Sequence, residues 1–171
     1  MDMPFYSRNS RTSLPSFNAK NDFSANKTPI IRELSNRPKV MLIIPNLNWV
    51  DKDLNALWDL IPWNLCMLAA MIEGFCEVKI VDAYDSNLSQ EEFENIIREF
   101  SPEVVGITVL MDQYGPAGHM AAELAKNVDP KIVTMMGGVY VTANPDDVIK
   151  DESLDYIVIG EGEYVLRDLI K

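Results

Sequence analysis

From residue 38 onward, short runs of β-branched and other apolar residues alternate with segments whose apolar residues recur every three to four positions. The runs are typical of buried strands, and the periodic segments are typical of amphipathic helices. Their regular alternation predicts βαβ units around a parallel sheet. The five expected strands span residues 39–44, 77–82, 104–110, 131–136 and 156–159.

Five helices are expected between and after these strands. The clearest follows Ser89, which forms a capping box with Glu92 ahead of an apolar stripe that ends at Phe100. Another begins at Pro62 and stops at Gly74, as helix termini prefer. The remaining helices are expected at residues 117–128, at 145–150 and from 163 onward.

These elements predict an α/β fold, a doubly wound, flavodoxin-like or Rossmann-like parallel sheet of five strands. Right-handed crossovers with helices on both faces favour the strand order 2-1-3-4-5, with a switch point between strands one and three. The folded domain is expected to cover residues 38–171. Residues 1–37 are rich in Ser, Asn and Pro without a sustained period, which predicts a disordered or loosely docked tail.

Composition and charge narrow the class of protein. No apolar stretch approaches the roughly 18 to 20 residues needed to cross a bilayer, and we expect a cytoplasmic protein. The chain carries a net charge of −11, and residues 38–171 alone carry −14, which argues against nucleic acid as a partner. The two cysteines, Cys66 and Cys76, are expected to be buried free thiols, and no cysteine cluster has metal-binding spacing.

The most informative feature is a set of three turns, each of which follows an expected strand. The first contains Thr108 and Leu110, the second is the pair Gly137 and Gly138, and the third is the segment 160–163. Because the carboxyl ends of parallel strands meet at one edge of a sheet, the three turns are expected to surround one ligand site.

Each turn also has an ordinary explanation when it is considered alone. Two consecutive glycines suit a tight turn, Thr108 suits a strand, and Glu161 and Glu163 suit the first turn of a helix. It is the shared position at one edge that indicates a site. A bulky residue at Gly138 is then expected to block the site and to leave the fold cooperative.

Segments 105–110, 136–142 and 155–163 resemble the cobalamin-binding domain that precedes the catalytic barrel in cobalamin-dependent radical S-adenosylmethionine enzymes. Segment 62–70 resembles the first helix of that domain, and segment 144–147 resembles its continuation after the Gly-Gly turn. The resemblance spans residues 38–170. No single motif is decisive, but the order and spacing of the segments are specific.

The resemblance implies that the nucleotide tail of cobalamin lies against these turns. The hydroxyl residue would face the tail, the glycines would let it lie against the backbone, and the corrin would rest over the edge of the sheet. The long loop 45–61 with Trp49, together with Trp58 or Trp63, would cover the corrin, although a core role for these tryptophans is an equal alternative. The residues expected to bind cobalamin are Thr108, Leu110, Gly137, Gly138, Gly160, Gly162 and Trp49.

The chain departs from related families at two points. Segment 45–49 lacks the histidine that ligates cobalt in methionine synthase-type domains, and the only histidine, His119, is expected to have a packing or surface role. The Cys-x-x-x-Cys-x-x-Cys motif that would hold a [4Fe–4S] cluster is absent. The resemblance therefore implies that S-adenosylmethionine and the cluster are bound by a C-terminal domain outside this sequence, and no metal ligand is expected within it.

Two functions stay open on the sequence alone. The first is a cobalamin-binding module of a radical S-adenosylmethionine enzyme, which binds without catalysing and for which methyl transfer is one of several reactions. The second is a cobalamin-free docking or regulatory domain of the same fold. A dinucleotide-dependent oxidoreductase is disfavoured because no glycine-rich phosphate loop follows the first strand.

Overall fold

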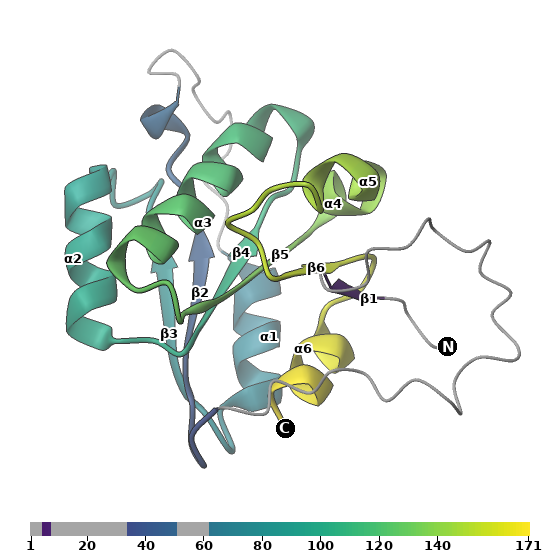
Figure 1. Ribbon diagram of the computed structural model, residues 1–171. Coiled ribbons are helices and arrows are strands. Elements are labelled where there is room, and N and C mark those ends of the chain that lie inside the picture. The colour runs from purple at the N-terminus through teal and green to yellow at the C-terminus, as the bar shows by residue number, and fades with distance from the viewer. Residues whose placement is uncertain (1–4, 8–33, 51–61) are drawn as a thin grey trace, which may run out of the picture.

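The computed structural model describes residues 5–7, 34–50 and 62–171, which form a six-stranded sheet with helices on both faces (Figure 1). The strand order is β1-β6-β5-β4-β2-β3. All neighbouring strands are parallel except β1 and β6, which are antiparallel. The strands are β1 Phe5–Ser7, β2 Lys39–Ile44, β3 Glu77–Asp82, β4 Val104–Thr108, β5 Val133–Gly137 and β6 Tyr156–Val158.

The five parallel strands from β2 to β6 confirm the predicted order 2-1-3-4-5. Strand β1 was not predicted, because three residues in a segment without a hydrophobic period give no strand signal. It pairs with β6 at the edge of the sheet, with Tyr6 opposite Ile157. The rest of the predicted tail, apart from residues 34–37, lies outside the described residues, and the domain boundary at residue 38 stays a prediction.

Six α-helices are described, one more than the five helices that the sequence predicted. They are α1 Trp63–Ile72, α2 Gln90–Phe100, α3 Gly115–Val128, α4 Val139–Ala143, α5 Pro145–Val148 and α6 Glu163–Ile170. Helix α4 was missed because it is short and begins with β-branched residues, which favour strands by propensity. The capping box before α2 is confirmed, since Ser89 Oγ accepts from Glu92 N and Glu92 Oε2 accepts from Ser89 N. Within the described part of the chain, no helix has the length and apolar character to cross a membrane.

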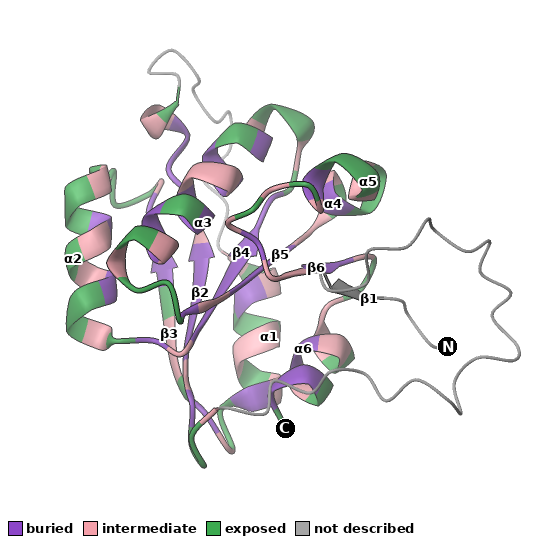
Figure 2. Ribbon diagram, in the orientation of Figure 1, coloured by how far each residue is buried: buried purple, intermediate pink, exposed green. Residues whose placement is uncertain are grey.

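The sheet separates two hydrophobic cores (Figures 1 and 2). On one face, Phe93 and Ile97 of α2 and Ala121 of α3 pack with β2, β4 and β5. On the other face, α1 and α6 lie side by side, and Leu65 and Leu166 belong to the same buried cluster. Strand β4 is buried along its whole length, so the turn that follows it is held from both faces.

The two cysteines differ in exposure, which corrects the expectation that both are buried. Cys76 is buried, and the burial raises the pKa of its thiol to about 11. Cys66 is exposed, because α1 has apolar residues all around its circumference and can bury only one side. Both thiols are free.

Candidate functional site

A cavity of about 370 Å³ opens at the carboxyl edge of the sheet, between α1 and α6. We call it the slot. Strands β4, β5 and β6 end in it, and the register places Thr108 beside Gly137 across the β4–β5 pair. Of the seven residues expected to bind the ligand, six line the slot. They are Thr108, Leu110, Gly137, Gly138, Gly160 and Gly162.

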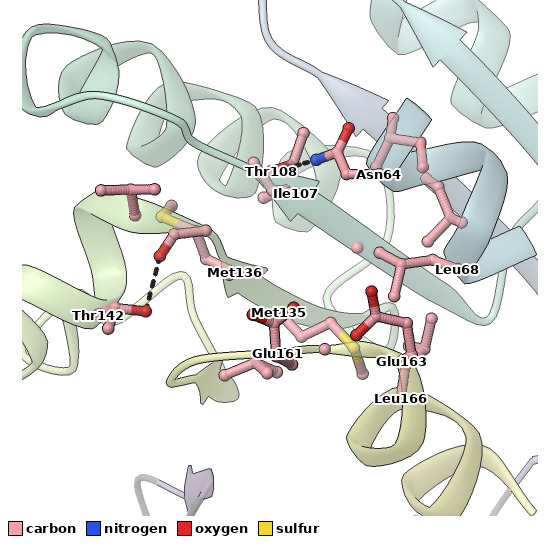
Figure 3. A pocket seen from close by; sticks show the side chains of 18 of the residues that line it. Asn64, Leu68, Ile107, Thr108, Met135, Met136, Thr142, Glu161, Glu163 and Leu166 are labelled. Atoms are coloured by element: carbon pink, nitrogen blue, oxygen red, sulfur yellow. Dashed lines mark hydrogen bonds between the residues drawn. The ribbon is translucent and has the colours of Figure 1, made fainter. Parts of the chain in front are cut away.

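The slot is apolar along most of its depth (Figure 3). Leu68 of α1, Met135 of β5 and Leu166 of α6 all contribute apolar side chains to its lining. Its charged lining residues are Glu161 and Glu163, at the turn before α6 and at the first residue of that helix. No lysine, arginine or histidine of the described residues lines the slot. The arrangement suits a flat, largely apolar ring with few polar atoms better than an anion.

Gly138 is required by the fold itself. Its φ of +107° lies in the left-handed region, and a Cβ built on it would stand 2.3 Å from the carbonyl oxygen of Val109. A bulky residue at Gly138 would therefore strain the fold as well as block the slot, so we expect it to lower stability, and whether unfolding stays cooperative remains a prediction. By contrast, a Cβ on Gly137 or Gly162 would meet its nearest atom at 3.5 or 3.4 Å, an ordinary contact. The backbone conformation does not require glycine at these two positions. Their lack of a side chain exposes backbone atoms on the wall of the slot.

Thr142 connects two of the three turns, a role that the sequence did not predict. Its hydroxyl donates to the carbonyl oxygen of Gly138 at 3.0 Å and accepts from the amide of Gly160 at 2.9 Å. A threonine four residues after Gly138 could have indicated a hydrogen bond from its hydroxyl back to the Gly138 carbonyl, as occurs within helices. This prediction requires α4, which the sequence did not indicate. Thr142 therefore fixes the glycine turns after β5 and β6 relative to each other.

A polar pair interrupts the apolar lining where α1 approaches the end of β4 (Figure 3). The side-chain amide of Asn64 donates to the hydroxyl oxygen of Thr108, with 2.8 Å between the two atoms. Thr108 was expected in the site from the sequence, whereas Asn64 was not. The two residues are 44 positions apart along the chain, and no sequence signal indicates that they meet. The pair places two hydrogen-bonding groups in an otherwise apolar part of the slot.

Trp49 lies apart from the other six predicted ligand-binding residues. Its ring packs on Phe93 with centroids 5.1 Å apart, and its indole N–H donates to the carbonyl oxygen of Leu88 at 2.6 Å. It is not among the residues that line the slot. Of the other tryptophans considered for the corrin, Trp63 is 68% exposed on α1, and Trp58 lies outside the described residues. Contact of Trp49 with a cofactor stays a prediction, and its observed contacts are those of a packed aromatic residue.

His119 has the packing role expected from the sequence. Its Nδ1 lies 2.5 Å from a carboxylate oxygen of Asp151, and its Nε2 lies 3.1 Å from the hydroxyl of Tyr140. These contacts tie α3 to the segment that begins with Gly138. Burial by itself would raise the pKa of Asp151, but hydrogen bonds from His119 and from the Ser153 amide outweigh it and hold that pKa below its usual 3.8.

The lowered pKa of Asp151 predicts an acid-dependent loss of stability. A carboxylate with a depressed folded-state pKa stabilises the fold above its unfolded-state value of 3.8, and this contribution is lost as the pH falls through the lower folded-state value. Chemical denaturation of wild type and Asp151→Asn across this range should give a difference in unfolding free energy that shrinks with acid. The control is Asp147→Asn, whose exposed pair with Lys150 should contribute little and vanish in salt. A difference for Asp151→Asn that stays constant down to pH values well below 3.8 would contradict the prediction.

Comparison with known proteins places the chain among proteins associated with cobalamin. The family described as the B12 binding domain matches residues 54–170. In the solved structures, a cobalamin-binding protein from Desulfitobacterium hafniense DCB-2 superposes with a TM-score of 0.51 and 14% identity, covering 77% of this chain and 57% of that one. At this identity, the superposition supports the fold alone.

Three relatives match parts of the chain. An uncharacterised methyltransferase of Pyrococcus horikoshii is 33% identical over 64% of this chain and 24% of its own length. An anaerobic magnesium-protoporphyrin IX monomethyl ester cyclase of Rubrivivax gelatinosus is 31% identical over 77% of this chain and 24% of its own length. A cytidylyl-2-hydroxyethylphosphonate methyltransferase of Streptomyces wedmorensis is 29% identical over 73% of this chain and 26% of its own length. The chain thus spans about a quarter of the length of these relatives.

Proposed function

Because this chain belongs to the B12-binding domain family, we propose that it binds cobalamin at the carboxyl edge of its sheet, with the nucleotide tail of the cofactor inside the slot. The observation that carries the proposal is the position of the slot, where three turns selected from the sequence meet. Thr108, Gly137 and Gly160 would then lie against the tail.

The dimensions and lining of the slot fit the tail of cobalamin. Ligand pockets hold about 300 to 1,000 Å³, so a slot of about 370 Å³ can take a flat bicyclic ring but not a corrin. Its apolar walls suit an aromatic ring, and its single Asn64–Thr108 pair suits one polar ring atom. The corrin would have to lie outside, where Leu110 and Val139 leave 37% and 62% of their surface exposed at the mouth.

The residues of this chain would hold and orient the cofactor. When bound, cobalamin supplies a cobalt centre that can carry a methyl group. The lining of the slot has no histidine within the described residues, so we expect no histidine of the slot to ligate cobalt. Thr142 would keep the two glycine turns at a fixed spacing around the tail, and Gly138 would keep the Val109 turn in contact with them.

We further propose that this domain works as part of a radical S-adenosylmethionine enzyme, in which S-adenosylmethionine and a [4Fe–4S] cluster are bound by another domain of the same polypeptide. Its matches to about a quarter of longer proteins named methyltransferases and cyclases support this proposal. Methyl transfer is the reaction we favour, because it is the activity named for two of the three relatives. A cytoplasmic location, expected from the sequence, stays a prediction.

Retention of cobalamin tests the proposed function. Purified protein of residues 1–171 is mixed with hydroxocobalamin, separated from free cofactor by gel filtration, and examined by visible absorption. We expect corrin absorbance to elute with the protein. Absence of corrin from the protein fraction, with a cooperative unfolding transition still present, would instead support the second function, a cobalamin-free docking or regulatory domain.

A further inference from the structure

We propose that Asn64 fixes the direction of the Thr108 hydroxyl so that it donates its hydrogen into the slot. Asn64 is then a positioning residue that selects cofactor tails with an unprotonated ring nitrogen. This inference rests on the proposed function, because it concerns the part of cobalamin that would occupy the slot. It goes beyond that function by naming the tail chemistry that the protein accepts and the residue that sets it.

The hydrogen bond between the two side chains sets this direction. A threonine hydroxyl has one hydrogen to donate and two lone pairs with which to accept. One lone pair of Thr108 is taken by the Asn64 amide, whose nitrogen lies 2.8 Å from the hydroxyl oxygen. No acceptor for the hydroxyl hydrogen of Thr108 is found within the described residues. Among the described residues, the protein thus supplies a donor to the Thr108 hydroxyl and no acceptor for its hydrogen.

The surroundings of Thr108 leave the slot as the place where that hydrogen can find a partner. Thr108 is only 7% exposed, so bulk water cannot readily satisfy it. The slot beside it is also lined by Leu110 and by Gly137, the register partner of Thr108 in β5. A buried donor without an acceptor is unfavourable, so a ligand that offers a lone pair at this point gains affinity.

The chemistry of this arrangement distinguishes between classes of cofactor tail. An imidazole-type nitrogen, as in a benzimidazole or a purine, presents an in-plane lone pair that can accept the Thr108 hydrogen. A phenol-type tail has no such nitrogen. A nitrogen that accepts from Thr108 has its lone pair engaged and is not available to cobalt. The bound cofactor should therefore show the visible spectrum of a corrin whose tail base is not coordinated.

Asn64→Asp is the sharpest test, because it changes one N–H donor into an acceptor with almost no change in shape. The aspartate carboxylate can only accept, so it would take the Thr108 hydrogen and turn a hydroxyl lone pair toward the slot. Two further variants accompany it. Asn64→Ala leaves the hydroxyl free to rotate, and Thr108→Val removes the hydroxyl while keeping the branched shape of the side chain.

Three probes report on the tail separately from the corrin. They are cyanocobalamin, with a benzimidazole tail, a cobamide with a phenol-type tail, and cobinamide, which lacks the tail. We expect Asn64→Asp and Thr108→Val to weaken cyanocobalamin binding about tenfold and Asn64→Ala to weaken it less. Affinity for the phenol-type cobamide and for cobinamide should stay within about twofold of wild type for every variant. Titration calorimetry measures the affinities, and thermal unfolding shows that each variant is folded.

The outcomes separate this inference from the proposed function. If wild type binds none of the three probes, the proposed function fails and the inference with it. If wild type binds cyanocobalamin and Asn64→Asp binds it equally well, the inference alone is overturned. An equal loss for cobinamide would also overturn it, because Asn64 would then act on the corrin or the fold. Should Asn64→Asp not fold, the same expectations apply to Asn64→Ala and Thr108→Val.

Discussion

Replacing Gly138 with alanine is expected to lower the free energy of unfolding by roughly 3 kcal/mol or more. Two costs add. The backbone at Gly138 has a φ of +107°, which a residue with a Cβ adopts only under strain, and the new Cβ would lie 2.3 Å from the carbonyl oxygen of Val109. That oxygen is backbone and accepts from the Tyr140 amide at 3.3 Å, so it cannot move away without breaking the turn.

Gly137→Ala is the matched control, since it adds the same methyl group to the neighbouring residue. Its φ is not in the left-handed region, and its Cβ would meet the Cβ of Val158 at 3.5 Å. We expect its unfolding free energy to stay within about 1 kcal/mol of wild type. Urea denaturation followed by circular dichroism measures both variants, and comparable stabilities for the two would refute this account of the turn.

The fold was largely predictable because its information is local. The central strands β2, β4 and β5 are largely buried, and such strands appear in the sequence as continuous apolar runs. The two elements that were missed lack this signal. Strand β1 is only three residues long, and α4 follows Gly138 with β-branched residues, so its helical form depends on the turn before it. Neither element had a period that could indicate it.

The site was predictable only as far as topology determines it. The turns after β4, β5 and β6 could be placed together because parallel strands end at one edge. The bonds inside the site could not, because Asn64 meets Thr108 and Thr142 meets Gly160 through side-chain geometry that depends on how α1 and α4 are positioned. Trp49 shows the same limit, since a loop aromatic carries no information about the face on which it packs.

The largest effect on binding is expected from Gly162→Phe. Gly162 precedes α6 with a φ of −90°, which any residue adopts, so the backbone tolerates the change. A Cβ there would lie 3.4 Å from the side chain of Leu68 and 3.9 Å from that of Val158, and both of these residues line the slot. The phenyl ring would therefore occupy the space proposed for the cofactor tail. We expect affinity for cyanocobalamin to fall at least about a hundredfold, equivalent to ~2.7 kcal/mol.

Gly74→Phe provides the control for an added phenyl ring. Gly74 lies just after the C-terminal end of α1, whereas Asn64 lies at the N-terminal end of this helix. A Cβ on Gly74 would have no atom within 4 Å. Its affinity for cyanocobalamin should equal that of wild type, while Gly162→Phe should bind cobinamide better than cyanocobalamin, because cobinamide has no tail to exclude. Wild-type affinity of Gly162→Phe for cyanocobalamin would show that the tail lies elsewhere. Since Gly162→Phe leaves the Asn64–Thr108 pair unchanged, it tests where the tail is bound and not which tail is selected.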